Sequence, residues 1–257
     1  MGEDLLVKLQ YLGQCGFLME APGVRIVTDP YLSYALDRNA TDRQPWHRAY
    51  PPPCTLAALA PDAVVISHAH PDHLDKETLA PYFAQGGGAP VIVPAPVLPF
   101  AKAFAPSACA AKAEQALRFQ NAEIIPIPCA HTQLRQDENG DYTALSYLIV
   151  LEGRRIFFGG DMSMYDGLAV HIRALEPDVL LLPANGADYF RTADGIIGNL
   201  SCIEAAKLTA SCGLREYIPM HHDLYPFNGC RVSWILDSAR DAGVAARVLA
   251  CGETIEL

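Results

Sequence analysis

The sequence predicts a single α/β domain built from two similar halves. Short apolar runs bounded by turn residues recur along the chain, helix-capping residues lie between several of them, and no low-complexity linker divides it. With 257 residues and 51% hydrophobic side chains, the chain is long enough to bury a large core. We therefore expect residues 1–257 to form one domain.

The first half begins with strands and then alternates strands with helices. The predicted strands are Val7–Leu12, Phe17–Ala21, Arg25–Thr28, Ala63–Ile66 and Val91–Val93. Thr55 and Asp75 are the expected N-caps of two helices. The alanine-rich stretch 100–113 is expected to be mostly helical, with Pro106 interrupting it. The proline-rich segment 29–53 is a connection of a length that is usually functional or mobile.

The second half follows the same plan. Its predicted strands are Glu123–Ile127, Ala144–Leu151, Arg155–Phe158, Val179–Leu182 and Glu216–Met220. Ser201 and Glu204 form a capping box, which predicts a helix from there to about Ser211. Residues 233–242 are expected to form a last helix, and residues 183–200 a polar loop.

Charge and composition exclude several classes of partner. A net charge of −10 argues against a nucleic-acid backbone, and no apolar run approaches the roughly 18 residues of a membrane span. Residues 1–4 lack the basic and apolar regions of a signal peptide. The eight cysteines form no C-x-x-C pair, so we expect mostly buried thiols in a reducing cytosol. We therefore expect a cytoplasmic protein that acts on a small molecule, with a homo-oligomer left open.

The most informative stretch is His68-Ala69-His70-Pro71-Asp72-His73, which comes just after the fourth predicted strand. His68 and His70 are two residues apart, so they project to the same side of an extended backbone. Pro71 ends the strand, and the turn can bring Asp72 and His73 toward the same point. Imidazole and carboxylate ligands together suit zinc, iron or manganese. The sequence therefore predicts a metal site here.

Further residues of metal-ligand type follow other predicted strands, namely Asp29, His131, Asp161 and His221. Each alone could be an ordinary turn or capping residue. Sites in α/β sheets form beyond the carboxyl ends of strands, so their recurrence there predicts that they converge on the hexapeptide. We expect His171 to lie on a helix face with a structural role, and the role of His47 is left undecided.

Taken together, these residues resemble the metallo-β-lactamase superfamily, whose hallmark is H-x-H-x-D-H followed by a lone His, a lone Asp and a final His. The resemblance runs from Leu12 to His221. Within the superfamily the chain is similar to the L-ascorbate-6-phosphate lactonase-like branch, through the stretches Tyr11–Phe17, Thr28–Tyr31, Gly159–Met162 and Ile218–Asp223. The resemblance implies an αββα four-layer sandwich, in which two mixed sheets pack face to face and helices flank them.

The resemblance also implies a ligand set and a hydrolytic activity. It assigns His68, His70 and His131 to a first metal, Asp72, His73 and His221 to a second, and Asp161 to a bridge between them. Manganese is associated with the lactonase-like members and zinc with others, and iron suits the same donors. The implied reaction is attack by a metal-activated water, with Asp72 and Asp161 as the catalytic carboxylates. Asp72 would be a ligand with two metals and a general base with one. Asp29 and His222 are expected to orient the ligands without binding the metal themselves, Asp29 by accepting a hydrogen bond from a ligand imidazole.

Candidate substrate contacts lie in and near the loop that follows Val179–Leu182. Arg191 could bind a phosphate or carboxylate, or pair with Asp188 or Asp194 instead. Asn185, Tyr189 and Tyr225 could position hydroxyl groups. The leading interpretation is a hydrolase of a small polar lactone or ester, with or without a phosphate group. The alternatives are a phosphodiesterase or nuclease of the same superfamily, which the acidic charge disfavours, and a non-hydrolytic di-iron redox protein.

Overall fold

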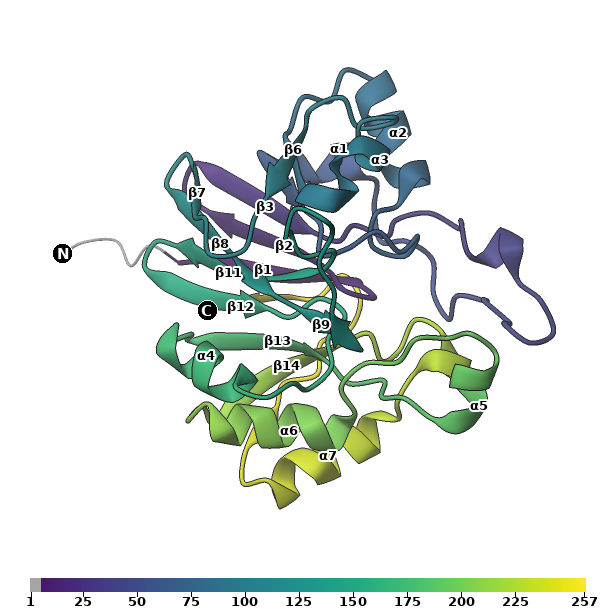
Figure 1. Ribbon diagram of the computed structural model, residues 1–257, viewed down its shortest axis with the longest axis vertical. Coiled ribbons are helices and arrows are strands. Elements are labelled where there is room, and N and C mark those ends of the chain that lie inside the picture. Colours follow the sequence, from purple (N-terminus) through teal and green to yellow (C-terminus); the bar gives the residue numbers. More distant parts are fainter. Residues whose placement is uncertain (1–5) are drawn as a thin grey trace.

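The computed structural model describes residues 6–257 and contains two mixed sheets of seven strands each (Figure 1). The first sheet has the order β16 (Thr254–Glu256), β1 (Lys8–Gly13), β2 (Gly16–Ala21), β3 (Val24–Thr28), β4 (Ala63–Val65), β5 (Val91–Pro94) and β6 (Ala108–Ala111). The second has the order β15 (Ala245–Ala246), β14 (Glu216–Met220), β13 (Val179–Pro183), β12 (Arg154–Phe158), β11 (Leu145–Leu151), β8 (Ala122–Pro128) and β7 (Leu117–Phe119). In each sheet an antiparallel part continues into a parallel part, at β3 and at β12.

Helices cover the outer face of each sheet, which confirms the predicted four-layer sandwich. The helices are α1 (Leu56–Leu59), α2 (Lys76–Ala84), α3 (Leu98–Ala101), α4 (Leu168–Ala174), α5 (Tyr189–Ala193), α6 (Cys202–Ser211) and α7 (Val232–Asp241). Figure 1 shows α1, α2 and α3 outside the first sheet and α6 and α7 outside the second. A small hairpin of β9 (Ala130–His131) and β10 (Gln133–Leu134) and the 3-10 turns η1 (Asp37–Asn39), η2 (Ala95–Val97) and η3 (Pro226–Asn228) complete the chain.

Successive side chains of a strand point to opposite faces of its sheet, and this divides the buried side chains of the sheets among three cores. Val65 and Phe158 point into the core between the sheets, whereas their neighbours Val64 and Phe157 point into the cores beneath the helices. All four side chains are fully buried. Because successive residues of a strand face opposite sides, a continuous apolar run is what a strand covered on both faces requires.

The structure confirms some local predictions and overturns others. The capping box of Ser201 opens α6, and Asp75 caps α2. The helix predicted over residues 100–113 is wrong, because α3 ends at Ala101 and Ala108–Ala111 forms the edge strand β6. There, pairing with β5 outweighs the helix propensity of alanine. The predicted loop 183–200 contains the short helix α5.

The predictions on the cysteines, on membrane spans and on the N-terminal residues can also be compared with the structure. All eight cysteines are free thiols, but only Cys15, Cys129 and Cys212 are buried, so the expectation of mostly buried thiols is wrong. In residues 6–257, none of the helices combines the length and the hydrophobicity that crossing a bilayer demands. The residues used for the signal-peptide prediction lie outside the described range.

Contacts between the sheets fix the edge at which β4, β12 and β14 end. The Tyr147 hydroxyl donates to the Ile66 carbonyl at 2.8 Å, and the Leu145 amide donates to the Ser67 carbonyl at 2.9 Å. Gly160 follows β12 with a φ of +63°, and a Cβ placed on it would lie 2.6 Å from the Ser67 Cβ. A glycine is therefore needed where the end of β12 crosses the end of β4.

We predict that Gly160→Ala destabilises the fold by more than the ordinary cost of a left-handed alanine. That conformation alone costs about 1–2 kcal/mol, and overpacking against Ser67 adds about 1–3 kcal/mol. Gly23→Ala is the matched control, because Gly23 has a φ of +77° and open space around it. Urea unfolding of both variants measures the difference. Equal losses would mean that the contact with Ser67 relaxes freely.

Candidate metal centre

All seven predicted ligands converge at this edge, in two groups within each of which the ligand atoms lie within 4.8 Å of one another. A third such group, Cys15, His73 and Asp161, shares one residue with each of them. One group contains His68, His70, His131 and Asp161, and the other contains Asp72, His73 and His221. The hexapeptide follows β4 of the first sheet, whereas the remaining three residues lie in β9 or follow β12 and β14 of the second half. The centre therefore forms only where residues from the two halves of the chain meet.

Asp161 lies between the groups and turns one carboxylate oxygen toward each. Its Oδ2 lies 3.7 Å from His131 Nε2. Its Oδ1 lies 3.3 Å from His73 Nε2 and 3.5 Å from His221 Nε2. Asp72 Oδ2 closes the second group at 3.6 and 3.5 Å from the same two nitrogens. One carboxylate in this position can serve two metal ions.

A buried hydrogen-bond chain orients one histidine from each group. Asp29 Oδ2 accepts from His73 Nδ1 at 2.6 Å and from the Ser67 hydroxyl at 2.6 Å. Because the hydroxyl proton of Ser67 is used, its oxygen accepts from His68 Nδ1, which lies 2.9 Å away. Both imidazoles therefore hold a proton on Nδ1 and turn Nε2 toward the centre.

The donor set fits a metal. The Nε2 atom of His68 is buried and has no hydrogen-bond partner, and the buried Nε2 of His73 faces only the carboxylates of Asp161 and Asp72, at 3.3 and 3.6 Å. Buried polar atoms are nearly always paired, so a metal ion fits as the missing partner of these nitrogens. Nitrogen and carboxylate donors with fixed tautomers are what zinc, manganese and iron sites use.

The two groups differ in protonation. Burial, reinforced by the neighbouring histidines, holds the pKa of His68 well below its usual value, and burial lowers the pKa of His131 to about 4. Burial also acts to lower the pKa of His73 and His221, but the carboxylates, led by Asp161, outweigh it and raise both. These two imidazoles therefore hold protons that a metal must displace, whereas His68 and His131 are already neutral.

The carboxylates respond in the opposite direction. Burial acts to raise the pKa of Asp72 and of Asp161, but the neighbouring His73 and His221 outweigh it and lower both. Both side chains are therefore ionised at neutral pH and can act as metal ligands.

Two residues of the β1–β2 turn join the centre, although the sequence analysis assigned them no role. Gln14 Nε2 donates to Asp72 Oδ2 at 2.7 Å and lies 3.0 Å from His221 Nε2. The Cys15 thiol lies 3.7 Å from Asp161 Oδ1, and burial followed by the nearby Asp161 raises its pKa well above the usual value. The signals available in the sequence were their place in the stretch Tyr11–Phe17, which carries part of the resemblance, and their position in a turn after a predicted strand.

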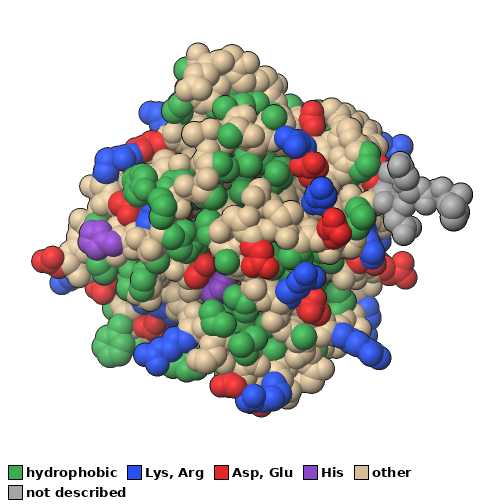
Figure 2. Space-filling model, turned by 180° about the vertical axis from the view of Figure 1, so that it is seen from behind, with side chains coloured by type: hydrophobic (Ala, Val, Ile, Leu, Met, Phe, Trp, Pro, Cys, Tyr) green, Lys and Arg blue, Asp and Glu red, His purple; other side chains and the backbone are tan. Residues whose placement is uncertain are grey.

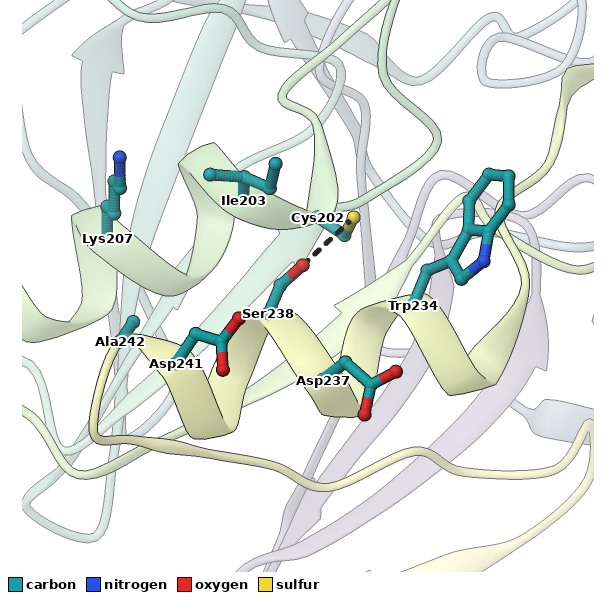
Figure 3. Close-up of a pocket in the computed structure, with 8 residues that line it drawn as sticks. All are labelled: Cys202, Ile203, Lys207, Trp234, Asp237, Ser238, Asp241 and Ala242. Atoms are coloured by element: carbon teal, nitrogen blue, oxygen red, sulfur yellow. Dashed lines mark hydrogen bonds between the residues drawn. The ribbon is translucent and has the colours of Figure 1, made fainter.

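A cavity of about 220 Å³ opens onto the centre. It is lined by Leu36, Gln44, Trp46, His70, Pro71, Asp72, Asp161, Gly195, Ile196, Ile197, His221 and Asn228. A larger groove of about 460 Å³ runs between α6 and α7, with Cys202 and Trp234 on its walls (Figure 3). None of the predicted ligands lines that groove, so the smaller cavity is the one relevant to chemistry at the centre.

The predicted substrate contacts do not line the cavity. Arg191 pairs with Asp188 and also donates to Asn228 Oδ1 and to the Asn185 carbonyl, both at 3.0 Å. Tyr189 is 78% exposed on α5. The Asn185 side chain is buried between Asn199 and Asn228.

Tyr225 and the remaining histidines also lie apart from the ligands. The Tyr225 hydroxyl lies 2.7 Å from that of Tyr31 and donates to Asp37 at 3.1 Å. His222 is buried but belongs to neither ligand group. His47 is exposed in a loop, and His171 lies on α4, as predicted.

Comparisons with known proteins agree on the fold and the family. A relative from Mycobacterium tuberculosis, described as an uncharacterized protein, is 32% identical over 165 residues, which are 62% of this chain and 43% of that protein. This chain thus spans less than half the length of that relative. A UPF0173 metal-dependent hydrolase of Carboxydothermus hydrogenoformans is 24% identical over 98% of this chain and its own full length.

Two solved structures illustrate the shared fold. Igni18, a metallo hydrolase of Ignicoccus hospitalis, has a TM-score of 0.71 and 22% identity, with 98% of both chains covered. CmlA, a di-iron β-hydroxylase of Streptomyces venezuelae, has a TM-score of 0.70 and 17% identity, with all of this chain but 55% of CmlA covered.

The family model of the β-lactamase superfamily domain matches residues 24–222. That range includes the hexapeptide and the three ligands supplied by the second half of the chain. Together with the four-layer sandwich, this match shows that the chain belongs to the metallo-β-lactamase superfamily.

Proposed function

We propose that this protein is a metal-dependent hydrolase of small lactones or esters. The observation that carries the proposal is a carboxylate, Asp161, that faces two groups of metal-type donors beside a small cavity. Relatives named as metal-dependent hydrolases support the reaction class. The similarity of the β1–β2 and β12 motifs to lactonase-like proteins supports the choice of a lactone or ester.

The seven ligand residues would bind two metal ions. His68, His70 and His131 would hold one metal, Asp72, His73 and His221 the other, and Asp161 would join them. When bound, such metals lower the pKa of a water molecule toward neutrality and polarise the substrate carbonyl. Asp72 keeps its two alternatives: with a second metal it is a ligand, and without one it is placed to take a proton from water. The nitrogen and oxygen donors accept manganese, zinc or iron.

A nuclease or phosphodiesterase role is disfavoured by charge. No lysine or arginine is among the residues that line the described cavity. Figure 2 shows one face of the molecule, on which basic side chains are scattered among acidic ones rather than gathered into a patch. Nucleic-acid binding depends on basic groups that neutralise phosphates, and the net charge of −10 opposes it.

A di-iron redox role shares the fold with CmlA and would use the same donors. Oxygen dependence separates the two functions, because hydrolysis consumes only water. Turnover of a lactone in the absence of oxygen would favour the hydrolase, and turnover that stops without oxygen would favour the redox protein.

We predict that the metal-loaded protein holds two metal equivalents and hydrolyses lactones. His221→Ala should lose the second equivalent, and Asp161→Ala should lose affinity for both, because only Asp161 faces both groups. Elemental analysis after dialysis, together with a proton-release assay of lactone hydrolysis, measures the result. His47→Ala is the control, since its side chain is exposed and belongs to neither group. Wild-type protein without bound metal would contradict the proposal.

We predict that metal binding to the second group releases more protons than binding to the first. The raised pKa values of His73 and His221 mean that both hold protons in the metal-free protein below those pKa values. Affinity for the second metal should therefore strengthen as pH rises, and weaken in acid. Stepwise zinc titration of the metal-free protein in weak buffer at pH 7 measures the protons. The release should shrink in His221→Gln, and equal release at both steps would refute the assignment.

We predict that Gln14→Ala weakens binding of the second metal by about 10- to 100-fold, the usual effect of removing a hydrogen bond to a ligand. The lost contact is the one to Asp72 Oδ2. Competition with a chelator measures the affinity. Gln10→Ala, in the strand that precedes Gln14 but bonded to the Gly252 carbonyl, is the control. Unchanged affinity in Gln14→Ala would show that Asp72 needs no support.

A further inference from the structure

Four apolar side chains line the cavity together with the metal-type donors, and we call these four the apolar wall: Leu36, Trp46, Ile196 and Ile197. Leu36 and Trp46 come from the long segment 29–53, and Ile196 and Ile197 come from the segment after α5. Gln44 Nε2 donates to the Asp194 carbonyl at 2.6 Å, which ties the two segments together. The wall is thus a structural unit built from two distant parts of the chain.

Trp46 is held in place by aromatic neighbours. Its ring meets Tyr225 edge-on at a centroid distance of 5.1 Å and Phe227 at 4.7 Å. The indole Nε1 donates to Gln44 Oε1 at 3.3 Å. Leu36 and Trp46 pack on the small buried cluster around Tyr31 and Tyr225. Because its supports are fixed, the indole is preorganised to contact a ligand.

Within residues 6–257, no lysine or arginine side chain lies beside this wall to pair with an anionic group of a substrate. The cavity lining within the described residues contains no lysine or arginine. Arg191 is occupied by Asp188 and Asn228, and Arg48 donates to the carbonyls of Tyr31 and Ser33. A phosphate group placed against the wall would lose its hydration without gaining the partner that such a group needs.

We infer that the substrate is an uncharged ester or lactone whose apolar part packs against Leu36, Trp46, Ile196 and Ile197. The inference rests on the proposed hydrolase function and narrows its substrate class. In this orientation the apolar part covers the wall, and the carbonyl faces Asp72, Asp161 and His221, which line the same cavity. A cavity of about 220 Å³ is smaller than the sites of drug-sized ligands, so the substrate is small.

Chain-length dependence tests the inference. The zinc-loaded protein is assayed with γ-lactones that carry methyl through pentyl side chains, and with L-ascorbate 6-phosphate. We expect kcat/KM to rise about fourfold per methylene until the wall is covered, which corresponds to about 0.8 kcal/mol each. L-Ascorbate 6-phosphate should be hydrolysed at least tenfold less efficiently than the best of these lactones. In Trp46→Ala and Ile197→Ala, the dependence on chain length should flatten.

Two control variants change an arginine and a tryptophan that lie outside the apolar wall. Arg43→Ala removes an exposed arginine beside Gln44 and should leave the lactone series unchanged. Trp234→Phe changes the groove between α6 and α7 and should also leave it unchanged. Because the chain has two tryptophans, Trp234→Phe makes Trp46 the only one. Its fluorescence then reports binding at the wall directly.

The binding experiment separates the failure of the inference from the failure of the proposed function. Zinc-loaded Trp234→Phe is titrated with 2-pentylcyclopentanone, which lacks a scissile bond, and with pentyl phosphate, which carries the same chain. We expect saturable quenching by the ketone at lower concentration than by the phosphate. If the ketone binds better but no lactone is hydrolysed, the proposed function is wrong and the apolar preference stands. If the phosphate binds more tightly, or L-ascorbate 6-phosphate is the better substrate, the inference is overturned.

Discussion

The buried carboxylate of Asp29 is the interaction on which the metal centre depends. Its side chain has no exposed surface, so its charge is stable only if every oxygen is paired. The pairing is complete: the Ser67 amide and hydroxyl and the His73 imidazole all donate to it. Through Ser67 the same carboxylate also sets the tautomer of His68. One residue at the end of β3 thus determines which nitrogen two histidines present to the centre.

This arrangement requires backbone conformations that most residues avoid. Gln14, Asp29, Thr132 and His221 all have positive φ values, of 55°, 33°, 66° and 55°. Each lies in the centre or next to one of its ligands, at the point where the chain leaves a strand. Strained conformations of this kind cost of order 1–3 kcal/mol and persist only where the surroundings hold them. The packing of the two sheets therefore stabilises the strain at these four positions.

The ligands could be predicted from the sequence because each is a rare residue type at the end of an apolar run. Among the supporting residues, Asp29 was expected from the resemblance, but Gln14 and Cys15 were not, since they belong to no metal-ligand pattern and reach the centre only through the turn between β1 and β2. The alanines of β6 led to the wrong prediction of a helix, because helix propensity depends on the residue type alone. It does not take into account that the edge of the sheet at β5 is free to pair with this segment. For Arg191 the sequence left open a substrate contact or an ion pair with Asp188 or Asp194; the structure shows the pair with Asp188, and the additional contact with Asn228 depends on chain packing that the sequence does not show.

The division of the ligands between the two sheets has a thermodynamic consequence. The hexapeptide follows β4 in one sheet, whereas Asp161 and His221 follow strands of the other. A metal that binds both sets binds only the packed sandwich, so its binding free energy adds to the stability of that packing. Without metal, the raised pKa values of His73 and His221 show that protons take over part of this role, because they compensate the carboxylates of Asp72 and Asp161. The core between the sheets and the chemistry at their edge are therefore coupled through the same buried charges.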